Sequence, residues 1–269
     1  MKAALPLVFA SLPLHAATLS GLWEFNNPAN LGVATIGSDL TVNGPASATG
    51  GSADLPKGSW LSVPNPVGAN GPSGTPSRTN QYSIVLDFQI PDFTDGGTDD
   101  GTFTSLFDFD NGGSDADFFI RKQVLAEELG LSGQWPYVGS GPGSNGDGTS
   151  GTILTNTWYR LVLTADVGVG RAVYLNGSLV GNFTVGSQDS VRQSLSTASP
   201  WRVLWDNDGE TSGALISNLA IFDGRLNGTE VASLGGAGSP IPEPSSLGLA
   251  GLGALLSLRR RRQAAARGN

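Results

Sequence analysis

The segment Tyr82-Ser83-Ile84-Val85-Leu86-Asp87-Phe88-Gln89-Ile90 places a large apolar side chain at every second position. Side chains two residues apart lie on the same face of a β-strand, so this spacing predicts a strand with one face toward a core. Ser83, Asp87 and Gln89 are expected on the opposite, outward face, and Pro91 ends the strand.

The segment Trp158–Asp166 alternates in the same way and predicts a second long strand. A third is expected at residues 214–222 near the end of the domain. The residues predicted to share one core are Ile84, Leu86, Phe88, Tyr159, Leu161, Leu163, Leu219 and Ile221.

Shorter apolar segments, separated by Gly and Pro, predict further strands. They lie at residues 19–25, 39–43, 59–63, 102–108, 117–121 and 201–205. Residues 171–175 and 178–183 flank Asn176-Gly177 and predict a hairpin with a type I′ turn, because both turn residues tolerate positive φ. Residues 122–131 fit either one helical turn or an exposed strand.

A single short helix is expected at residues 225–234, with Asn227 or Thr229 as its N-cap and Gly235-Gly236 as its end. Strand otherwise follows strand with no intervening helical pattern. The sequence therefore predicts an all-β, two-sheet antiparallel sandwich with one short C-terminal helix.

Composition excludes several kinds of chemistry. The chain has no Cys, and its one His is His15, close to the N-terminus. Ser-His-Asp and Cys-His catalysis, zinc sites and haem ligation are therefore not expected in the domain. Its net charge is −8, and six of its 15 basic residues are Lys2 and five arginines from Arg259 onward, so the part between is more acidic still. Nucleic acid and anionic membrane surfaces are poor partners for such a domain, whereas a divalent cation or a neutral glycan suits it.

The N-terminus has the layout of a secretory signal peptide. Met1-Lys2 is a minimal basic start, and Ala3–Leu14 is an apolar region interrupted by two prolines. Leu14-His15-Ala16 or His15-Ala16-Ala17 provides the small-residue cleavage site, so residues 1–17 are predicted to be removed. The alternative is a buried N-terminal strand.

The C-terminus has the layout of a sorting signal. Pro242-Glu243-Pro244 precedes an apolar or small run of 12 residues, Leu247–Leu258, and then Arg259, Arg260, Arg261 and Arg262. The run is shorter than the roughly 20 residues that span a bilayer as a helix. A short membrane anchor with its arginines on the cytoplasmic side is the alternative.

These three features, in this order at the chain end, resemble the PEP-CTERM sorting signal of Gram-negative bacteria. The resemblance implies export, transient anchoring in the inner membrane, and recognition by an exosortase-type membrane protease. Removal of the tail would then place the protein at the cell surface or in the extracellular matrix. Bacteria with such proteins typically make exopolysaccharide or biofilm matrix, so an extracellular polysaccharide is an expected partner.

The domain between these signals, residues 18–238, resembles a LamG-like jelly roll of the concanavalin A type; residues 239–269 form the sorting segment. Four motifs carry the resemblance, in order along the chain: Leu19–Phe25, Asn156–Leu163, Val173–Gly177 and the closing strand and helix within residues 216–236. The acidic region at residues 92–117 and the insertion at residues 132–152 depart from the family pattern, and these are regions where such domains differ in ligand.

The segment Asp206-Asn207-Asp208-Gly209-Glu210 is a candidate calcium site. Ca²⁺ takes six to eight oxygen ligands, and Asp206, Asp208 and Glu210 on a tight turn can converge on one ion. The spacing is not that of an EF-hand. The alternative is a solvated acidic loop.

Trp135 and Tyr137 lie in a Gly- and Ser-rich segment rather than in a predicted strand. An aromatic ring on a loop is a natural platform for the apolar face of a sugar, so these two residues are candidate ligand-binding residues. The alternative is a Trp packed over the edge of the sandwich.

An enzyme without His or Cys would have to use carboxylates, as retaining glycosidases do. The E-x-D-x-E strand of laminarinase-like jelly rolls is absent, and Glu127-Glu128 are adjacent, so on a strand they would point apart. We therefore expect a non-catalytic, exported surface or matrix protein associated with carbohydrate or exopolysaccharide. The alternatives are a structural surface protein without a small ligand and a glycoside hydrolase-like enzyme.

Overall fold

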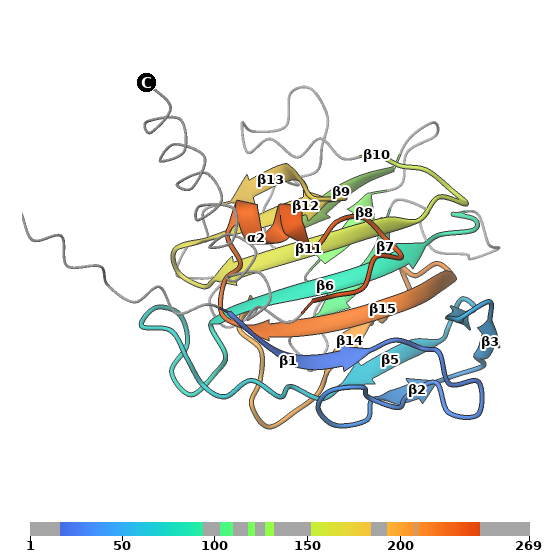
Figure 1. Ribbon diagram of the computed structural model, residues 1–269, viewed down its shortest axis with the longest axis horizontal. Coiled ribbons are helices and arrows are strands. Elements are labelled where there is room, and N and C mark those ends of the chain that lie inside the picture. The colour runs from blue at the N-terminus through green and yellow to red at the C-terminus, as the bar shows by residue number, and fades with distance from the viewer. Residues whose placement is uncertain are drawn as a thin grey trace, which may run out of the picture.

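The computed structural model describes residues 17–93, 103–109, 118–121, 127–131, 152–183, 193–207 and 209–242. These residues form two antiparallel sheets packed face to face (Figure 1). We call them the back sheet and the front sheet. The back sheet has the order β13 (Ser178–Phe183), β12 (Gly170–Leu175), β11 (Tyr159–Asp166), β6 (Gln81–Gln89), β15 (Ala214–Asp223), β4 (Ser52–Leu55) and β3 (Ser47–Thr49).

The strand β1 (Thr18–Trp23) also belongs to the back sheet. It pairs with Leu219–Asp223 of β15, while β4 pairs with Ala214–Ile216 of the same strand. Both partners are on the side of β15 opposite β6, which pairs with β15 along nearly its whole length. The first and the last strands of the domain are therefore neighbours.

The front sheet has the order β10 (Thr152–Ile153), β9 (Glu127–Leu131), β8 (Phe118–Arg121), β7 (Phe103–Asp108), β14 (Trp201–Val203), β5 (Trp60–Val63) and β2 (Thr41–Asn43). The ambiguous segment at residues 122–131 thus contains a strand over its last five residues. The sequence did not predict β3 and β4, which form a hairpin around Gly50 and Gly51, both at positive φ.

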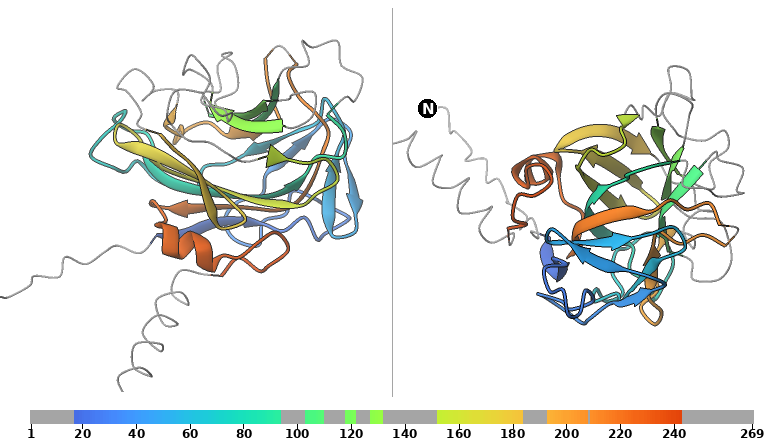
Figure 2. Two further views of the ribbon diagram at one scale, coloured as in Figure 1. Left: turned by 90° about the horizontal axis from the view of Figure 1, so that it is seen from above. Right: turned by 90° about the vertical axis from the view of Figure 1, so that its right-hand side faces the viewer.

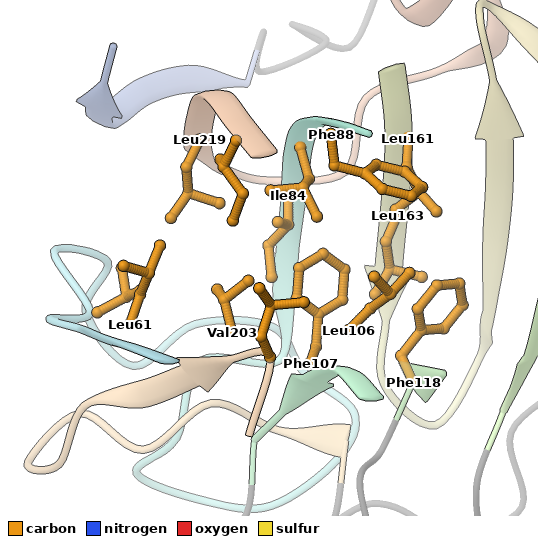
Figure 3. Packing of buried hydrophobic residues seen from close by; sticks show 14 of the residues in the cluster. Leu61, Ile84, Phe88, Leu106, Phe107, Phe118, Leu161, Leu163, Val203 and Leu219 are labelled. Carbon is orange, nitrogen blue, oxygen red and sulfur yellow. The ribbon is translucent and has the colours of Figure 1, made fainter. Parts of the chain in front are cut away.

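The core fills the space between the sheets (Figure 3). Leu161 and Leu163 of β11 point toward Phe107 and Phe118 of the front sheet, and all four are fully buried. The predicted core is confirmed, since each of its members is buried in this one cluster: Ile84, Leu86, Phe88, Tyr159, Leu161, Leu163, Leu219 and Ile221.

The Asn176-Gly177 hairpin is also confirmed. Only these two residues separate β12 from β13, and their φ angles are 48° and 81°, as a type I′ turn requires. The Asn176 side chain adds a second role, because its oxygen accepts a hydrogen bond from the Arg160 backbone N–H at 2.9 Å.

The short helix α2 (Gly228–Ser233) lies on the face of the back sheet that points away from the front sheet (Figure 2). Asn227 is its N-cap, and Glu230 completes a capping box by accepting from the Asn227 N–H. Beneath the helix is a second apolar cluster, made by Ala17, Leu19, Leu22, Val85, Val162, Ala220, Phe222, Leu226, Val231 and Leu234.

This cover changes the environment of the outward face of β6. Ser83 and Asp87 were predicted to point outward, and they do lie opposite the core, but both are 0% exposed. Ser83 donates to the Gly224 carbonyl and accepts from the Leu226 N–H. Under α2 and the residues that follow it, the outer face of the back sheet is therefore a second buried layer and not a solvent surface.

Residues 234–241, which we call the strap, follow α2 across this same face. Arg160 of β11 donates to the carbonyl oxygens of Leu234 and Ser239 at the two ends of the strap's turn. Asp87 of β6 accepts from the Gly238 N–H at 3.3 Å. Leu234 and Ile241 pack against the outer apolar cluster, so the ordered chain continues up to the proline motif.

Within these described ranges, no helix is both long and apolar enough to cross a membrane. The apolar run at residues 247–258 lies outside them.

Candidate ligand face and cavity of the front sheet

A row of polar side chains crosses the outer face of the front sheet. Leu61 and Val63, and likewise Trp201 and Val203, belong to the core, so Ser62 and Arg202 between them point outward. The same alternation directs Thr41 of β2 and Asp108 of β7 outward. The members of this row are Thr41, Ser62, Arg202 and Asp108.

Register brings these four residues together. Thr41 is the partner of Ser62, Ser62 is the partner of Arg202, and Arg202 is the partner of Asp108. Directly opposed residues in antiparallel strands have Cβ atoms about 4.5–5.5 Å apart. The row therefore runs straight across β2, β5, β14 and β7, at right angles to the strands.

Charge and aromatic groups are combined at the centre of the row. The Arg202 guanidinium lies 3.2 Å from the Asp108 carboxylate and 3.9 Å from the centre of the Trp205 ring. The Arg202 side chain is 21% exposed and that of Asp108 is 1% exposed. Such a guanidinium is held in place by its two neighbours while its side chain stays partly exposed to solvent.

A second aromatic group flanks the row on β5. Trp60 is half-buried and, two residues before Ser62, shares its outward face. The neighbouring Asn43 donates to the Ser62 hydroxyl at 3.0 Å. The face thus combines two tryptophans, hydroxyls, an amide and one ion pair.

The row opens at its β2 end into a cavity of about 320 Å³. Thr41 and Ser62 belong to both the row and the cavity wall, and residues 197–200 contribute to the same wall. The cavity is lined by Asp39, Thr41, Ser62, Pro64, Asn65, Thr197, Ala198, Ser199 and Pro200. Carboxylate, hydroxyl and amide groups dominate this lining, and they can both donate to and accept from a polyhydroxylated ligand.

The acidic loop after β14 is attached to β7 through its backbone. Ser105 donates from its hydroxyl to the Trp205 carbonyl at 2.6 Å and from its N–H to the Glu210 carbonyl at 2.7 Å. Leu204 has a φ of 60°, an uncommon conformation for a branched residue, and its N–H donates to the Leu106 carbonyl. The strands therefore fix both ends of this loop.

The loop contains the predicted calcium ligands. Asp206 is 8% exposed, and Glu210 is half-buried, while Asp208 lies outside the described residues. Among the described residues, no group of three or more Asp, Glu, His or Cys side chains is placed to hold a metal ion. Calcium binding here stays a prediction.

The other predicted site residues fall mostly outside the described part of the chain. Trp135 and Tyr137 do so, as do Glu243, Pro244, Arg259, Arg260, Arg261 and Arg262. Pro242 is described, directly after the strap. Sequence reasoning missed the polar row, since its four members come from strands far apart in the chain and only the register aligns them.

The sequence matches two family profiles. Residues 87–232, more than half of the chain, match the concanavalin A-like lectin/glucanases superfamily. Residues 240–262 match the PEP-CTERM protein-sorting motif. The chain therefore belongs to the concanavalin A-like lectin/glucanase superfamily and carries a PEP-CTERM motif, which indicates export and sorting to the cell envelope or surface.

Solved structures with the same fold include binding domains and enzymes. Domain 4 of AbnA, an extracellular arabinanase from Geobacillus stearothermophilus in complex with arabinotriose, is 20% identical with a TM-score of 0.55, over 82% of this chain and 100% of that domain. The Trypanosoma rangeli sialidase in complex with sialic acid is 18% identical with a TM-score of 0.55, over 84% of this chain and 33% of the sialidase.

Botulinum neurotoxin type C, whose cell entry depends on interaction with two ganglioside molecules, is 14% identical with a TM-score of 0.53. The match covers 81% of this chain and 50% of the toxin chain. No curated protein sequence matches the chain. At these identities the similarity concerns the fold, and the chain spans only a third to a half of the sialidase and toxin chains.

Proposed function

We propose that this is an exported, non-catalytic protein of the Gram-negative cell surface or matrix, and that it binds a neutral glycan on the outer face of the front sheet. The observation that carries the ligand assignment is the polar row, aligned by register and continuous with a hydroxyl-lined cavity. Pockets that bind small ligands combine an apolar or aromatic wall with a few fixed polar groups, and this face has both.

The ligand class follows from charge. Arg202 is already paired with Asp108, and the chain as a whole carries a net charge of −8. An acidic glycan would meet a repulsive domain and one partly neutralised cation, whereas a neutral glycan needs only hydrogen bonds and a ring face. The arabinotriose complex of AbnA domain 4 supports this reading, because that domain of the same fold is matched over its full length.

The absence of catalysis is part of the proposal. His15 is the only histidine and the chain has no cysteine, so chemistry in the domain would depend on carboxylates. On the outer face of the front sheet, the described carboxylate in the row is Asp108, which is nearly inaccessible and paired with a guanidinium. Such a group suits fixed positioning rather than proton transfer.

The sorting steps complete the proposal. An N-terminal signal peptide directs export, and an exosortase-type protease removes the tail from about Pro242 onward. The order of Pro242-Glu243-Pro244, the apolar run and the arginines supports the second step. The basic start and the apolar region at residues 1–14 support the first.

A glycan array probed with the exported protein tests the ligand assignment, with and without Ca²⁺. Ser199→Trp places a large ring against the cavity, and Trp60→Ala removes an aromatic wall beside the row. Each is expected to weaken glycan binding about tenfold or more, corresponding to loss of a buried contact of roughly 1.4 kcal/mol. Ser47→Trp, on exposed β3 of the back sheet, is the matched control and should bind normally.

Three results would change the proposal. Binding that survives both front-sheet substitutions places the ligand elsewhere, with Trp135 and Tyr137 as the next candidates. A protein that binds no glycan supports a structural surface role. Release of shorter sugars from any bound glycan makes the protein a hydrolase.

A further inference from the structure

The strap is fixed by a pair of opposite charges with no exposure to solvent. Arg160 donates to Asp87 through Nε and Nη2, both at 2.7 Å, and both side chains are 0% exposed. Two of the other three N–H donors of Arg160, one on Nη1 and one on Nη2, go to the carbonyl oxygens of Leu234 and Ser239. The strap is thus part of the hydrogen-bond network that makes this buried pair tolerable.

Asp87 is satisfied in the same way. Besides Arg160, it accepts from the Asn218 side chain at 3.0 Å and from the Gly238 N–H at 3.3 Å. Releasing the strap would leave both charged groups short of partners inside the protein, which is costly. The strap is therefore held more firmly than its irregular backbone alone suggests.

The sorting motif begins where this attachment ends. Ser239 is the last residue bound by Arg160, and Glu243 is only four positions further on. Four residues reach at most about 14 Å when fully extended. The apolar run starts at Leu247, eight residues after Ser239, so the Ser239 carbonyl lies within about 28 Å of the start of this run.

We propose that the strap is a gate on tail removal: the sorting enzyme acts on the motif only when residues 234–241 leave the back sheet. This inference rests on the proposed function, since it takes the tail to be removed by a membrane protease. Once the domain has folded, the closed strap delays removal of the tail, so the protein stays anchored in the membrane for longer. The gate also makes Arg160 a positioning residue for processing, although the residue is distant in sequence from the motif.

The strap has to open because proteins commonly recognise a peptide chain in an extended form. A bound peptide is commonly held as an extended strand whose backbone groups pair with the receptor. In the closed strap those groups are already used by Arg160, Asp87 and internal turns such as Ser239 N–H to Gly236 O at 3.2 Å. When opening and reclosing are fast, cleavage follows the equilibrium population of the open form.

An insertion separates the motif from the gate without touching the buried pair. Ten Gly and Ser residues placed between Ile241 and Pro242, after the last residue of the strap, give the enzyme free chain beside the motif while the strap stays closed. Pulse–chase labelling in the producing host, with precursor and processed form separated by size, measures the rate. We expect removal of the tail to accelerate about tenfold or more. The same insertion between Gly50 and Gly51, in the exposed β3–β4 turn, is the control and should leave the rate unchanged.

A second variant opens the gate itself. Replacing Arg160→Met together with Asp87→Leu removes both charges, a change that buried ion pairs often tolerate, and deletes the bonds to the strap. Hydrogen exchange of the purified full-length protein reports on the strap directly. The amides of Gly238 and Ser239 should be protected in the unaltered and inserted proteins and exchange freely in the double variant, with the core strands protected in all three. The double variant should also be processed faster than the unaltered protein.

The outcomes separate the gate from the sorting proposal. Normal tail removal at a rate unaffected or slowed by the Ile241–Pro242 insertion overturns the gate alone. Unprotected Gly238 and Ser239 amides in the unaltered protein overturn it as well. A tail that is never removed from the unaltered protein overturns the proposed sorting, and the gate with it.

Discussion

Replacing Asp87 with alanine removes a carboxylate that accepts four hydrogen bonds, two from Arg160 and one each from Asn218 and Gly238. Arg160 then keeps its charge in a site where its side chain is 0% exposed. Removing one partner of a buried ion pair costs about 3–5 kcal/mol, because the other charge is left without compensation. A domain of this size shifts its Tm by about 2–4 °C per kcal/mol, so Asp87→Ala should melt roughly 6–20 °C lower.

Urea unfolding of the exported protein, followed by tryptophan fluorescence, measures the free energy of unfolding directly. The double change Asp87→Leu with Arg160→Met removes the stranded charge and should recover most of the loss. Asp54→Ala is a matched control, because this half-buried aspartate is on β4 of the same sheet, and it should change stability by less than about 0.5 kcal/mol. The reasoning is refuted if Asp87→Ala costs less than about 1 kcal/mol, or if the double variant is as unstable as the single one.

Three further outcomes are expected. Leu161→Ala should lower the free energy of unfolding by about 2–5 kcal/mol in the same urea experiment, because Leu161 is 0% exposed between the sheets. The intact mass of the surface form should lack the tail from about Pro242, including Arg259–Arg262. Millimolar Ca²⁺ should raise the melting temperature, because a ligand at 100 times its dissociation constant adds about 2.7 kcal/mol to the free energy of unfolding. Asp206→Asn with Asp208→Asn should abolish the increase.

Each of these has its own control. Leu179→Ala, at a leucine that is 57% exposed, should leave the unfolding free energy nearly unchanged, and an equal loss at both leucines would contradict the core assignment. A surface form that retains Arg259–Arg262 would indicate a simple membrane anchor. Identical melting curves in calcium and in chelator would show that the loop at residues 206–210 binds no calcium.

Local sequence patterns were sufficient to predict the long strands and the Asn176-Gly177 turn. Two-residue alternation identified the inner faces of β6 and β11, and Asn176-Gly177 identified the hairpin, since both signals depend on neighbours in the chain. The β3–β4 hairpin was missed because Ser47–Thr49 has no large apolar residue, although Gly50-Gly51 was a usable turn signal.

The environment of each face could not be predicted in the same way. Alternation separates the two sides of β6 but does not show that α2 and the strap cover the outer side. The sequence therefore predicted the direction of the Asp87 side chain but not its burial. The row from Thr41 to Asp108 depends on the registers of four strands joined by long connections. Register between distant strands is set by tertiary packing, which no local pattern encodes.

The pairing of β1 with β15 has a consequence for the way the domain acquires its structure. Thr18 is the register partner of Asp223, although the two residues are at opposite ends of the domain in sequence. In a chain that crosses a membrane from its N-terminus, β1 and β6 emerge well before the strand that lies between them. Until β15 arrives, their edges are unpaired and the apolar faces are uncovered, a state prone to aggregation. Contacts of such long sequence separation also form slowly. In the proposed export, the back sheet therefore closes only after β15 has crossed the membrane, and the strands that emerge earlier are exposed to aggregation until then.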